Sequence, residues 1–313
     1  MTKLSFVIPC YRSEKTIENV VKEIKETVSS REGYAYEVIC VNDCSPDGVY
    51  DVLERLAAED KNVKVINFAK NMGKHSAVLA GYHYVTGQFV VNLDDDMQSP
   101  VPELWKLIDP LENDECDVAT AEYYEKKQAG WKNFGSAVNM KVGEILLEKP
   151  KNLRIENFSA IKRFVAEEMI RYENPYPYLE GLILRVTSRI KVVKMEERER
   201  GDGNTTGYTF KKSLALFANG FTAFSVKPLR IATFTGVLAA FAGFVGAIIT
   251  VIRRLIGSIS IAGYASTMVI QLILGGLILM CLGLLGEYIG RIYISLNKAP
   301  QYVVRNTINT DSD

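Results

Sequence analysis

The 313-residue chain has few of the residues that form disulfide frameworks or zinc sites, since it contains only five cysteines and two histidines. No two cysteines have C-x-x-C spacing, and His75 and His83 have no cysteine near them in the sequence. A zinc site is therefore not expected. An odd number of thiols without a pairing pattern also argues against a disulfide-rich secreted protein, so we expect reduced cysteines in the cytosol.

The chain also has no excess charge of either sign, because 37 basic side chains balance 37 acidic ones. It lacks the basic surplus of nucleic-acid binders, and we expect no nucleic-acid partner. The balance is uneven along the chain. Residues 1–226 carry 30 basic and 34 acidic side chains, whereas residues 227–313 carry 7 and 3. The two parts are therefore predicted to lie in different surroundings.

Two long runs without charged residues lie near the C-terminus, whereas the N-terminal apolar run is too short for a signal peptide. Residues 231–252 would form a helix of about 33 Å, which can cross a bilayer core of about 30 Å. The second run begins with Gly and Ser residues typical of a connection, so we place the second span at 266–286. The alternative is two buried core helices, but such helices are rarely so long and apolar all round.

The basic residues around these runs predict the orientation of the hairpin. Seven of them flank the two spans, and only Arg253 and Arg254 lie between the spans. The excess of positive charge marks the cytoplasmic side. We therefore expect a multi-pass protein of the cytoplasmic membrane, with its large N-terminal part in the cytoplasm. The flanking residues are Lys211, Lys212, Lys227, Arg230, Arg291, Lys298 and Arg305.

Short apolar segments alternate with helical ones in the first 123 residues. Continuously apolar strands suit a parallel sheet covered on both faces, and the alternation predicts an α/β class with a doubly wound, mostly parallel sheet. The expected strands are residues 4–9, 36–41, 63–68, 88–93 and 117–121, and the expected helices are residues 15–29, 46–58, 74–85 and 102–111. Further on, we expect strands at 156–162 and 190–196 and helices at 131–147 and 164–172.

The patterns divide the chain into a domain at residues 1–210, an amphipathic helix within 211–230, the hairpin at 231–286 and a C-terminal tail at 287–313. The helix carries Leu and Phe residues suited to the membrane surface, with lysines near the head groups. The alternative is a helix packed on the N-terminal domain with no lipid role.

Polar clusters follow the first four expected strands, at residues 11–14, 42–47, 69–74 and 94–98. In doubly wound sheets, ligands bind outside the carboxyl ends of the strands. All four clusters fall on this one edge, which predicts a binding site there.

Three consecutive carboxylates, Asp94, Asp95 and Asp96, follow the fourth strand. They repel one another unless a positive charge compensates them. Asp94 and Asp96 can point to one side of an extended segment and hold a divalent cation together with a substrate diphosphate. The alternative is a solvated acidic turn that caps the helix near Pro102.

Two more strand-end residues have competing interpretations. Asp43 either binds a nucleobase or ribose, or caps the helix expected near Pro46, a role that Ser45 fills equally well. Lys74 lies at the start of a helix, where the N-terminus favours anions. Its alternative is a solvated lysine beside a plain cap.

These segments resemble a known family. VIPCYRSE, VNDCSPDG, NMGKHSAVLAG and LDDDMQSP follow one another as in inverting family-2 glycosyltransferases of the GT-A fold. The later segments TGYTFKKSLAL, GFTAFSVKPLR and GEYIGRIYISLNKAPQYVV resemble the polyprenyl-phosphate glycosyltransferases, which include dolichol-phosphate mannose synthases and bacterial bactoprenol glucosyltransferases. The likeness covers residues 4–304, and EYIGRIY points to the bacterial two-span branch.

The resemblance implies roles on the donor side. Asp94 and Asp96 would bind Mg²⁺ or Mn²⁺, and Gln98 would join the metal ligands. Asp95 would contact these ligands without contacting the ion. The nucleoside pocket would be lined by Pro9, Tyr11, Glu14 and Asp43.

On the acceptor side, Ser136 matches a family serine near the acceptor phosphate, with Lys132 close by. Arg200 matches a family arginine, but the segment RGDGNTTGY is one residue longer than usual, so Arg198 is a rival. Lys211 is a further cation for the phosphate. Glu180 is the candidate base if the reaction needs one, and its alternative is a linker carboxylate at a helix start.

The implied function is the inverting, metal-dependent transfer of a hexose from a UDP-sugar to undecaprenyl phosphate, which makes a lipid-linked sugar for the cell envelope. Glucose is the default sugar, with an aminosugar or galactose as alternatives, and a homo-oligomer is compatible with the resemblance. The acceptor phosphate is anionic at neutral pH and needs no general base. Two other hypotheses remain, a saccharide acceptor and a membrane-tethered nucleotide-binding protein with a degenerate site.

Overall fold

The computed structural model describes residues 1–123, 153, 155–175, 177–196, 198, 227–256, 264–297 and 300–310. The chain forms two compact units, Met1–Ser213 with Lys298–Asp313, and Leu214–Asn297. The helix expected at 131–147 lies outside the described residues, as do residues 211–226 of the segment expected to hold the amphipathic helix.

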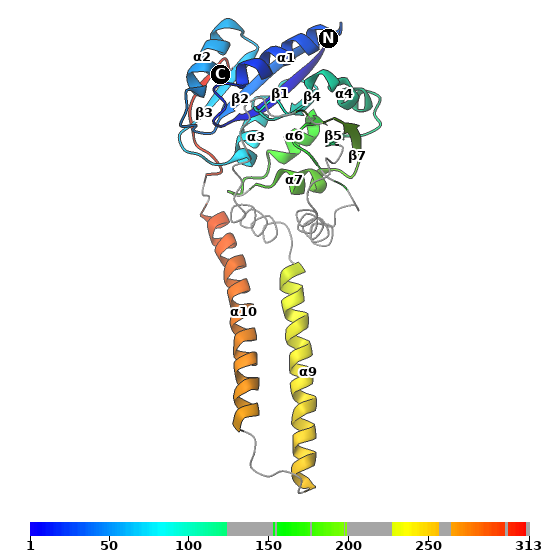
Figure 1. Ribbon diagram of the computed structural model, residues 1–313, viewed down its shortest axis with the longest axis vertical. Helices are drawn as coiled ribbons and strands as arrows, with labels where there is room; N and C mark the ends of the chain where they lie inside the picture. The colour runs from blue at the N-terminus through cyan, green and yellow to red at the C-terminus, as the bar shows by residue number, and fades with distance from the viewer. Residues whose placement is uncertain are drawn as a thin grey trace. The chain divides into compact units, whose positions relative to one another are not determined.

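In the described residues of the first unit, eight strands form one sheet in the order β7-β5-β6-β4-β1-β2-β3-β8 (Figure 1). The strands are β1 (Thr2–Cys10), β2 (Tyr34–Asn42), β3 (Val63–Phe68), β4 (Phe89–Asn92), β5 (Val118–Tyr123), β6 (Ser159–Lys162), β7 (Ile190–Met195) and β8 (Val304–Ile308).

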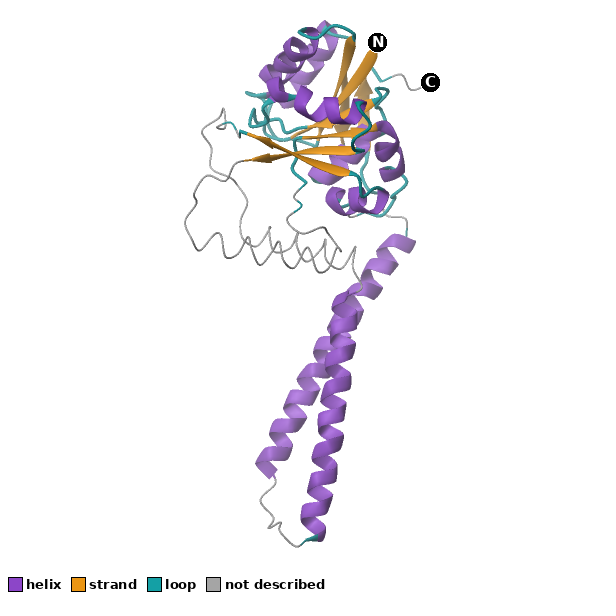
Figure 2. Cartoon of the chain, turned by 90° about the vertical axis from the view of Figure 1, so that its right-hand side faces the viewer, coloured by secondary structure: helices purple, strands orange, loops and turns teal. Residues whose placement is uncertain are grey.

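Helices lie on both sides of this sheet (Figure 2). In chain order the helices of the first unit are α1 (Ile17–Ser29), α2 (Val49–Glu59), α3 (Lys74–Tyr82), η1 (Val101–Glu103), α4 (Trp105–Glu112), α6 (Arg163–Met169) and α7 (Leu179–Val186). The expected strand and helix alternation is confirmed up to residue 123, with ends shifted by a few residues.

The centre of the sheet is doubly wound. Strands β3, β2, β1 and β4 pair in parallel, and the chain reverses its direction of progress between β1 and β4. The outer strands are mixed, because β6 runs antiparallel to β4 and β5, and β8 runs antiparallel to β3. The α/β class with a mostly parallel sheet is confirmed, and its switch point lies between β1 and β4.

Successive side chains of β1 point to opposite faces of the sheet. Phe6 belongs to a fully buried cluster with residues of α1, α2 and α4. Val7 faces α3, which packs so closely that a Cβ atom at Gly81 would lie 2.5 Å from Val7 Cγ1. Glycine at this position therefore lets α3 lie close against the sheet.

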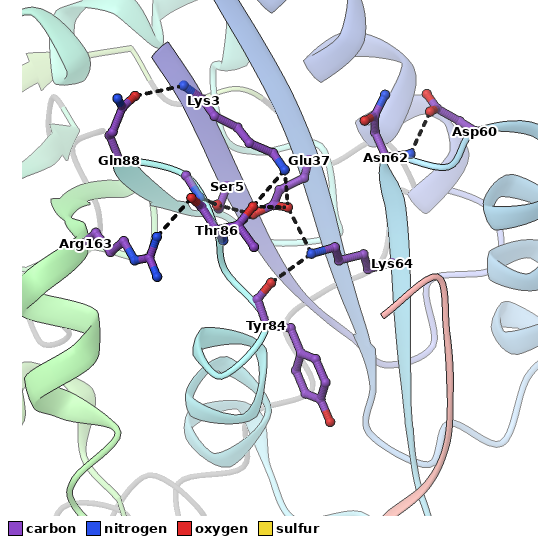
Figure 3. A network of polar contacts seen from close by, with 11 residues as sticks. Lys3, Ser5, Glu37, Asp60, Asn62, Lys64, Tyr84, Thr86, Gln88 and Arg163 are labelled. Atoms are coloured by element: carbon purple, nitrogen blue, oxygen red, sulfur yellow. Dashed lines mark hydrogen bonds and ion pairs between the residues drawn. The ribbon is translucent and has the colours of Figure 1, made fainter. Parts of the chain in front are cut away.

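A buried carboxylate ties the amino ends of the central strands together (Figure 3). Glu37 of β2 is 1% exposed and lies 2.8 Å from Lys3 Nζ and 3.0 Å from Lys64 Nζ. It also accepts hydrogen bonds from Ser5 Oγ at 2.5 Å and from the Thr86 backbone N–H at 2.6 Å. Burial alone would raise the pKa of Glu37, but these donors outweigh it and lower the pKa to about 2.

The C-terminal segment adds a strand that the sequence analysis did not anticipate. Strand β8 pairs with β3 from Val65↔Ile308 to Phe68↔Val304. Just before it, the Tyr302 ring stacks on Phe68 with centroids 5.3 Å apart. The residues that follow the hairpin thus belong to the sheet of the first unit.

The described part of the second unit consists of α9 (Lys227–Leu255) and α10 (Tyr264–Leu296). Among the described residues one stretch, Ile273–Ile294, is long and apolar enough to cross a membrane, and none of its most apolar window is buried within the protein. Residues Ala232–Gly246 of α9 are apolar over a shorter stretch. Large side chains such as Phe241 and Leu279 are two-thirds exposed, which does not fit the alternative of buried core helices.

Candidate functional site

The loops after β1 and β4 meet at the switch point of the sheet. The Tyr11 backbone N–H donates to Asp95 Oδ2 at 2.9 Å, and Thr16 Oγ1 donates to the Asp95 carbonyl at 2.5 Å. These bonds bring the acidic triplet beside the segment that leads into α1. The predicted convergence of the first and fourth strand-end clusters is confirmed.

Asp95 is turned into the protein. Burial raises its pKa to about 6, the charges of Asp94 and Asp96 add to this effect, and the Tyr11 N–H opposes it. Its carboxylate contacts the β1 loop and does not cap the short helix η1, which has no side-chain cap. Asp95 therefore does not have the helix-capping role of the alternative interpretation.

Asp94 is paired with a cation from the neighbouring helix. Lys74 Nζ, in the first turn of α3, forms an ion pair with Asp94 Oδ1, and Asn157 Nδ2 donates to Asp94 Oδ2 at 2.8 Å. Lys74 is thus not the solvated lysine of the alternative interpretation. The repulsion expected within the triplet is partly compensated by a positive charge on the protein itself.

Asp96 and Gln98 occupy the turn that follows. The Gln98 N–H donates to Asp96 Oδ1 at 3.2 Å, and the Gln98 carbonyl accepts the Arg198 N–H at 3.4 Å. The chain near residue 198 therefore lies beside the acidic triplet. The Arg198 guanidinium, however, binds Glu23 of α1 at 2.6 Å.

The donor set fits a cation that is shared with a substrate. The described residues contain no group of three or more His, Cys, Asp or Glu side chains that could hold a metal. The triplet and the turn after it offer the carboxylates of Asp94 and Asp96 and the amide oxygen of Gln98, which are all oxygen ligands. Mg²⁺ takes one or two carboxylates and fills its other positions with water and substrate phosphates.

Asp43 has a role that neither sequence interpretation included. Its carboxylate accepts the backbone N–H groups of Met72 at 2.6 Å and Gly73 at 2.9 Å, just before α3. Helix α2 begins at Val49, so Asp43 does not cap it. Burial raises the pKa of Asp43 in spite of these two N–H donors. These two bonds hold the loop before α3 in the conformation that places Lys74 against Asp94.

Glu14 and Asp47 join the loops after β1 and β2. Asp47 Oδ2 accepts the Glu14 N–H at 3.0 Å, and Glu14 Oε2 accepts the Gly48 N–H at 3.2 Å. Tyr11 is 44% exposed, so its ring is available to a ligand. Pro9, in contrast, is buried within β1 opposite Val41.

The same loops hold three non-glycine residues with left-handed backbone: Arg12 (φ 59°), Cys44 (φ 51°) and Met97 (φ 67°). One follows each of β1, β2 and β4. This conformation costs about 1–2 kcal/mol per residue and persists where surrounding contacts enforce it. The strand-end loops are therefore held in defined shapes.

Glu180 lies in the first turn of α7, as its alternative interpretation predicts. The Tyr178 hydroxyl donates to Glu180 Oε2, and burial raises the Tyr178 pKa. The Tyr178 ring meets His75 edge-on, with centroids 5.7 Å apart. Burial, with a smaller effect of Lys74, lowers the pKa of His75 to about 4. His75 is therefore neutral at physiological pH.

The acceptor-side candidates Lys132, Ser136, Arg200 and Lys211 lie outside the described residues. Among the residues that the structure describes, the sequence analysis did not single out Asn157 and Asp47. Asp47 stands in the quoted VNDCSPDG segment, whose density of polar residues was a usable signal. Asn157 precedes β6, 63 residues after Asp94, and no local pattern distinguishes it.

Comparison with known proteins decides the family. The family model described as "Glycosyl transferase family 2" matches residues 5–170, which is more than half of the chain. The chain belongs to glycosyl transferase family 2. A second model, "GtrB C-terminal hairpin", matches residues 227–292 of this glycosyltransferase.

Two relatives match the glycosyltransferase along nearly its whole length. The "Uncharacterized glycosyltransferase YkcC" of Bacillus subtilis is 30% identical over 308 residues, covering 98% of this chain and 95% of the relative. The "Bactoprenol glucosyl transferase" of Shigella phage SfV is 30% identical over 311 residues, covering 97% and 98%.

A solved structure supports the fold. Glucosyl-3-phosphoglycerate synthase from Mycobacterium tuberculosis, in complex with Mn²⁺ and UDP-glucose, aligns with a TM-score of 0.51. The alignment covers 71% of this glycosyltransferase and 77% of that chain at 17% sequence identity. This similarity places the first unit among GT-A-like folds.

Proposed function

We propose that the protein transfers a hexose from a UDP-sugar to undecaprenyl phosphate at the cytoplasmic face of the membrane, with inversion at the anomeric carbon. The acidic triplet at the β1/β4 switch point carries this proposal, because it offers two carboxylates beside a lysine where nucleotides bind to such sheets. The match to the GtrB-type hairpin and the relatives named bactoprenol glucosyl transferase support the lipid acceptor.

Asp94, Asp96 and Gln98 would hold Mg²⁺ or Mn²⁺ together with the diphosphate. The bound ion would supply charge neutralisation for the leaving diphosphate. Lys74 provides a second positive charge at the same place, since it already lies against Asp94. Asp95 holds the triplet on the β1 loop through the Tyr11 N–H.

The nucleoside would bind over the loops after β1 and β2. The exposed Tyr11 ring and Glu14 would contact it directly. Asp43 and Pro9 would act by shaping the pocket, because the Asp43 carboxylate binds the 72–73 backbone and Pro9 is buried.

On the acceptor side, the phosphate oxygen attacks as an anion, so orientation and charge matter more than proton removal. Lys132, Ser136, Arg200 and Lys211 would hold this phosphate. Arg200 is preferred over Arg198, whose guanidinium is engaged by Glu23. Glu180 is not required as a base. Its hydrogen bond from Tyr178 favours a role within α7 and gives the saccharide-acceptor hypothesis no support.

The hairpin would anchor the enzyme as two spans whose flanks face the cytoplasm, and the helix within 211–230 would lie at the membrane surface. This arrangement suits a lipid acceptor, whose phosphate stays at the interface while its chain remains in the bilayer. The seven flanking basic residues support the orientation.

The proposal is tested with a panel of radiolabelled nucleotide sugars and undecaprenyl phosphate, using full-length protein in detergent. We expect one UDP-hexose, by default UDP-glucose, to give divalent-metal-dependent counts in the lipid phase. UDP-galactose and UDP-N-acetylglucosamine test the alternatives. The absence of lipid-phase counts with every sugar would refute the proposal.

A further inference from the structure

Three asparagine side chains form a row across the sheet near the carboxyl ends of its parallel strands. In register, Asn42 of β2 lies opposite Asn67 of β3, and Asn67 lies opposite Asn306 of β8. Asn42 Nδ2 donates to Asn67 Oδ1 at 2.9 Å, and Asn67 Nδ2 donates to Asn306 Oδ1 at 2.9 Å. We call these three residues the asparagine row.

The asparagine row continues into the loops of the candidate donor site. Asn42 Oδ1 accepts the Ser45 N–H at 3.1 Å. Ser45 Oγ accepts the Arg12 N–H at 2.7 Å and donates to Asp47 Oδ1 at 2.5 Å. Asp47 in turn accepts the Glu14 N–H. A continuous chain of hydrogen bonds thus runs from β8 to the loop after β1.

The row has a direction, because each amide has one donor end and one acceptor end. Asn42 and Asn67 are 3% and 7% exposed, so their polar atoms depend on these partners. If Asn306 no longer accepts, the buried Asn67 Nδ2 group loses its partner, and the Asn67 amide is held less firmly against Asn42. A less firmly held Asn42 amide gives the Ser45 N–H a weaker acceptor.

The docking of β8 does not depend on this row alone. At the far end of the strand, Asn309 Nδ2 donates to the carbonyls of Ala57 at 2.7 Å and Val63 at 2.9 Å. Before the strand, Gln301 Nε2 donates to the carbonyls of Tyr172 and Asn174. The strand is therefore fixed at both ends. Between them, the exposed Asn306 accepts the bond from Asn67 and donates its own Nδ2 to the Tyr50 hydroxyl of α2 at 2.5 Å.

We propose that Asn306 is a positioning residue for the nucleotide-sugar site, and that it sets the shape of the 43–48 loop through Asn67 and Asn42. The inference rests on the proposed function for its nucleotide ligand. Through Asn306, the segment after the hairpin would influence donor binding without contacting the nucleotide sugar itself.

The test compares Asn306→Leu with Asn309→Gly in full-length protein. Leucine has a similar size and cannot accept a hydrogen bond. Because it also removes the bond from Asn306 to the Tyr50 hydroxyl, Tyr50→Phe is made as a second control and should leave the donor KM unchanged. Glycine removes the Asn309 side-chain bonds and tolerates the left-handed backbone there (φ 57°). Asn306→Ala is a milder variant, because water can replace the missing oxygen.

We expect Asn306→Leu to raise the KM for the UDP-sugar about fivefold or more, as expected for an unsatisfied buried amide. The kcat and the KM for the lipid acceptor should stay within twofold. Asn306→Ala should give a smaller increase, and Asn309→Gly should leave the donor KM unchanged even if it lowers the melting temperature. An unchanged donor KM in Asn306→Leu, or an equal rise in Asn309→Gly, would overturn the inference.

Amide hydrogen exchange in the unliganded protein gives a readout that does not need the nucleotide. The Ser45 and Arg12 amides should exchange faster in Asn306→Leu than in the wild type or in Asn309→Gly. Unchanged exchange would refute the positioning role. Faster exchange in a protein that binds no UDP-sugar would support the row and refute the proposed function, so the two failures are distinguishable.

Discussion

At the scale of single residues, the site is organised by compensation of negative charge. Asp94 has the cation of Lys74 and the amide of Asn157, and Asp95 has the Tyr11 N–H. These contacts offset part of the repulsion within the acidic triplet. Asp96, at the outer end of the triplet, is the carboxylate whose loss should be most specific to catalysis.

Asp96→Asn should reduce transfer by at least about 10²–10³-fold, because it removes a carboxylate proposed to hold the cation at the leaving diphosphate. EDTA should have the same effect on the wild type, and added Mg²⁺ or Mn²⁺ should reverse it. Initial rates of lipid-phase labelling measure both effects. Asp51→Asn, which changes an exposed carboxylate of α2, serves as the control. Near-normal turnover of Asp96→Asn would show that the metal assignment is wrong.

Glu37→Gln should destabilise the first unit by about 3 kcal/mol at pH 7, because a pKa lowered to about 2 reports a strongly stabilised carboxylate. The folded state binds this proton less readily than the unfolded chain, in which glutamates have a pKa of about 4.3. The Glu37 carboxylate therefore stabilises the folded state fully at pH values above about 4.3, and this stabilisation is lost as the pH falls towards 2.

Urea unfolding at several pH values measures this effect. The difference between the wild type and Glu37→Gln should shrink below pH 4. Glu26→Gln changes a glutamate that is 66% exposed and should have little effect at any pH. A difference that grows on acidification would contradict the assigned role of Glu37.

Much of the site could be predicted from sequence at this scale, because strand-end residues in a parallel sheet must share an edge. The meeting of Tyr11 with the acidic triplet follows from that rule. The partners of Asp43 could not be predicted, since they depend on how a loop 29 and 30 residues further along the chain folds back. Asn157 was missed for the same reason.

At the scale of elements, the position of α3 connects packing to chemistry. The helix lies against β1 and β2 at Gly81, and its first residue, Lys74, reaches Asp94. Any change that lifts the helix from the sheet should also withdraw the lysine from the acidic triplet.

Gly81→Ala should lower stability by about 1–3 kcal/mol, because the new Cβ overlaps Val7 Cγ1. Val7→Ala removes that atom, so the double variant should be more stable than the sum of the single effects predicts. Thermal unfolding of the four proteins measures the coupling. Strict additivity would mean that this contact does not set the helix position.

The elements themselves were largely predictable, because their apolar periodicity is local. Strands β1 to β5 and the helices between them follow from runs such as SFVIP and FVVNL. Strand β8 was not predicted. Its sequence VRNTI has little apolar character, and it becomes a strand by pairing with β3, more than 200 residues earlier.

At the scale of the whole molecule, the neutral sequence divides into an acidic and a basic part. The first 226 residues carry the excess of carboxylates, and the remainder carries seven basic and three acidic residues. This division fits the proposed arrangement, in which carboxylates of the catalytic domain would hold a cation and basic residues of the anchor would face anionic lipid.

The proposed topology predicts opposite accessibility for two positions. In intact cells, a membrane-impermeant thiol reagent should label Ser258→Cys, which lies between the spans, and should not label Ser312→Cys. After the cells are opened, both should react. Labelling of Ser312→Cys in intact cells would contradict a cytoplasmic C-terminus.

The central claim concerns the product. The most direct measurement is mass spectrometry of the lipid extract after the purified enzyme has been incubated with UDP-glucose, undecaprenyl phosphate and Mg²⁺. The account predicts a new species heavier than undecaprenyl phosphate by one hexose residue, absent with Asp96→Asn or EDTA. Glucose released only into water, or attached only to a soluble saccharide, would contradict it.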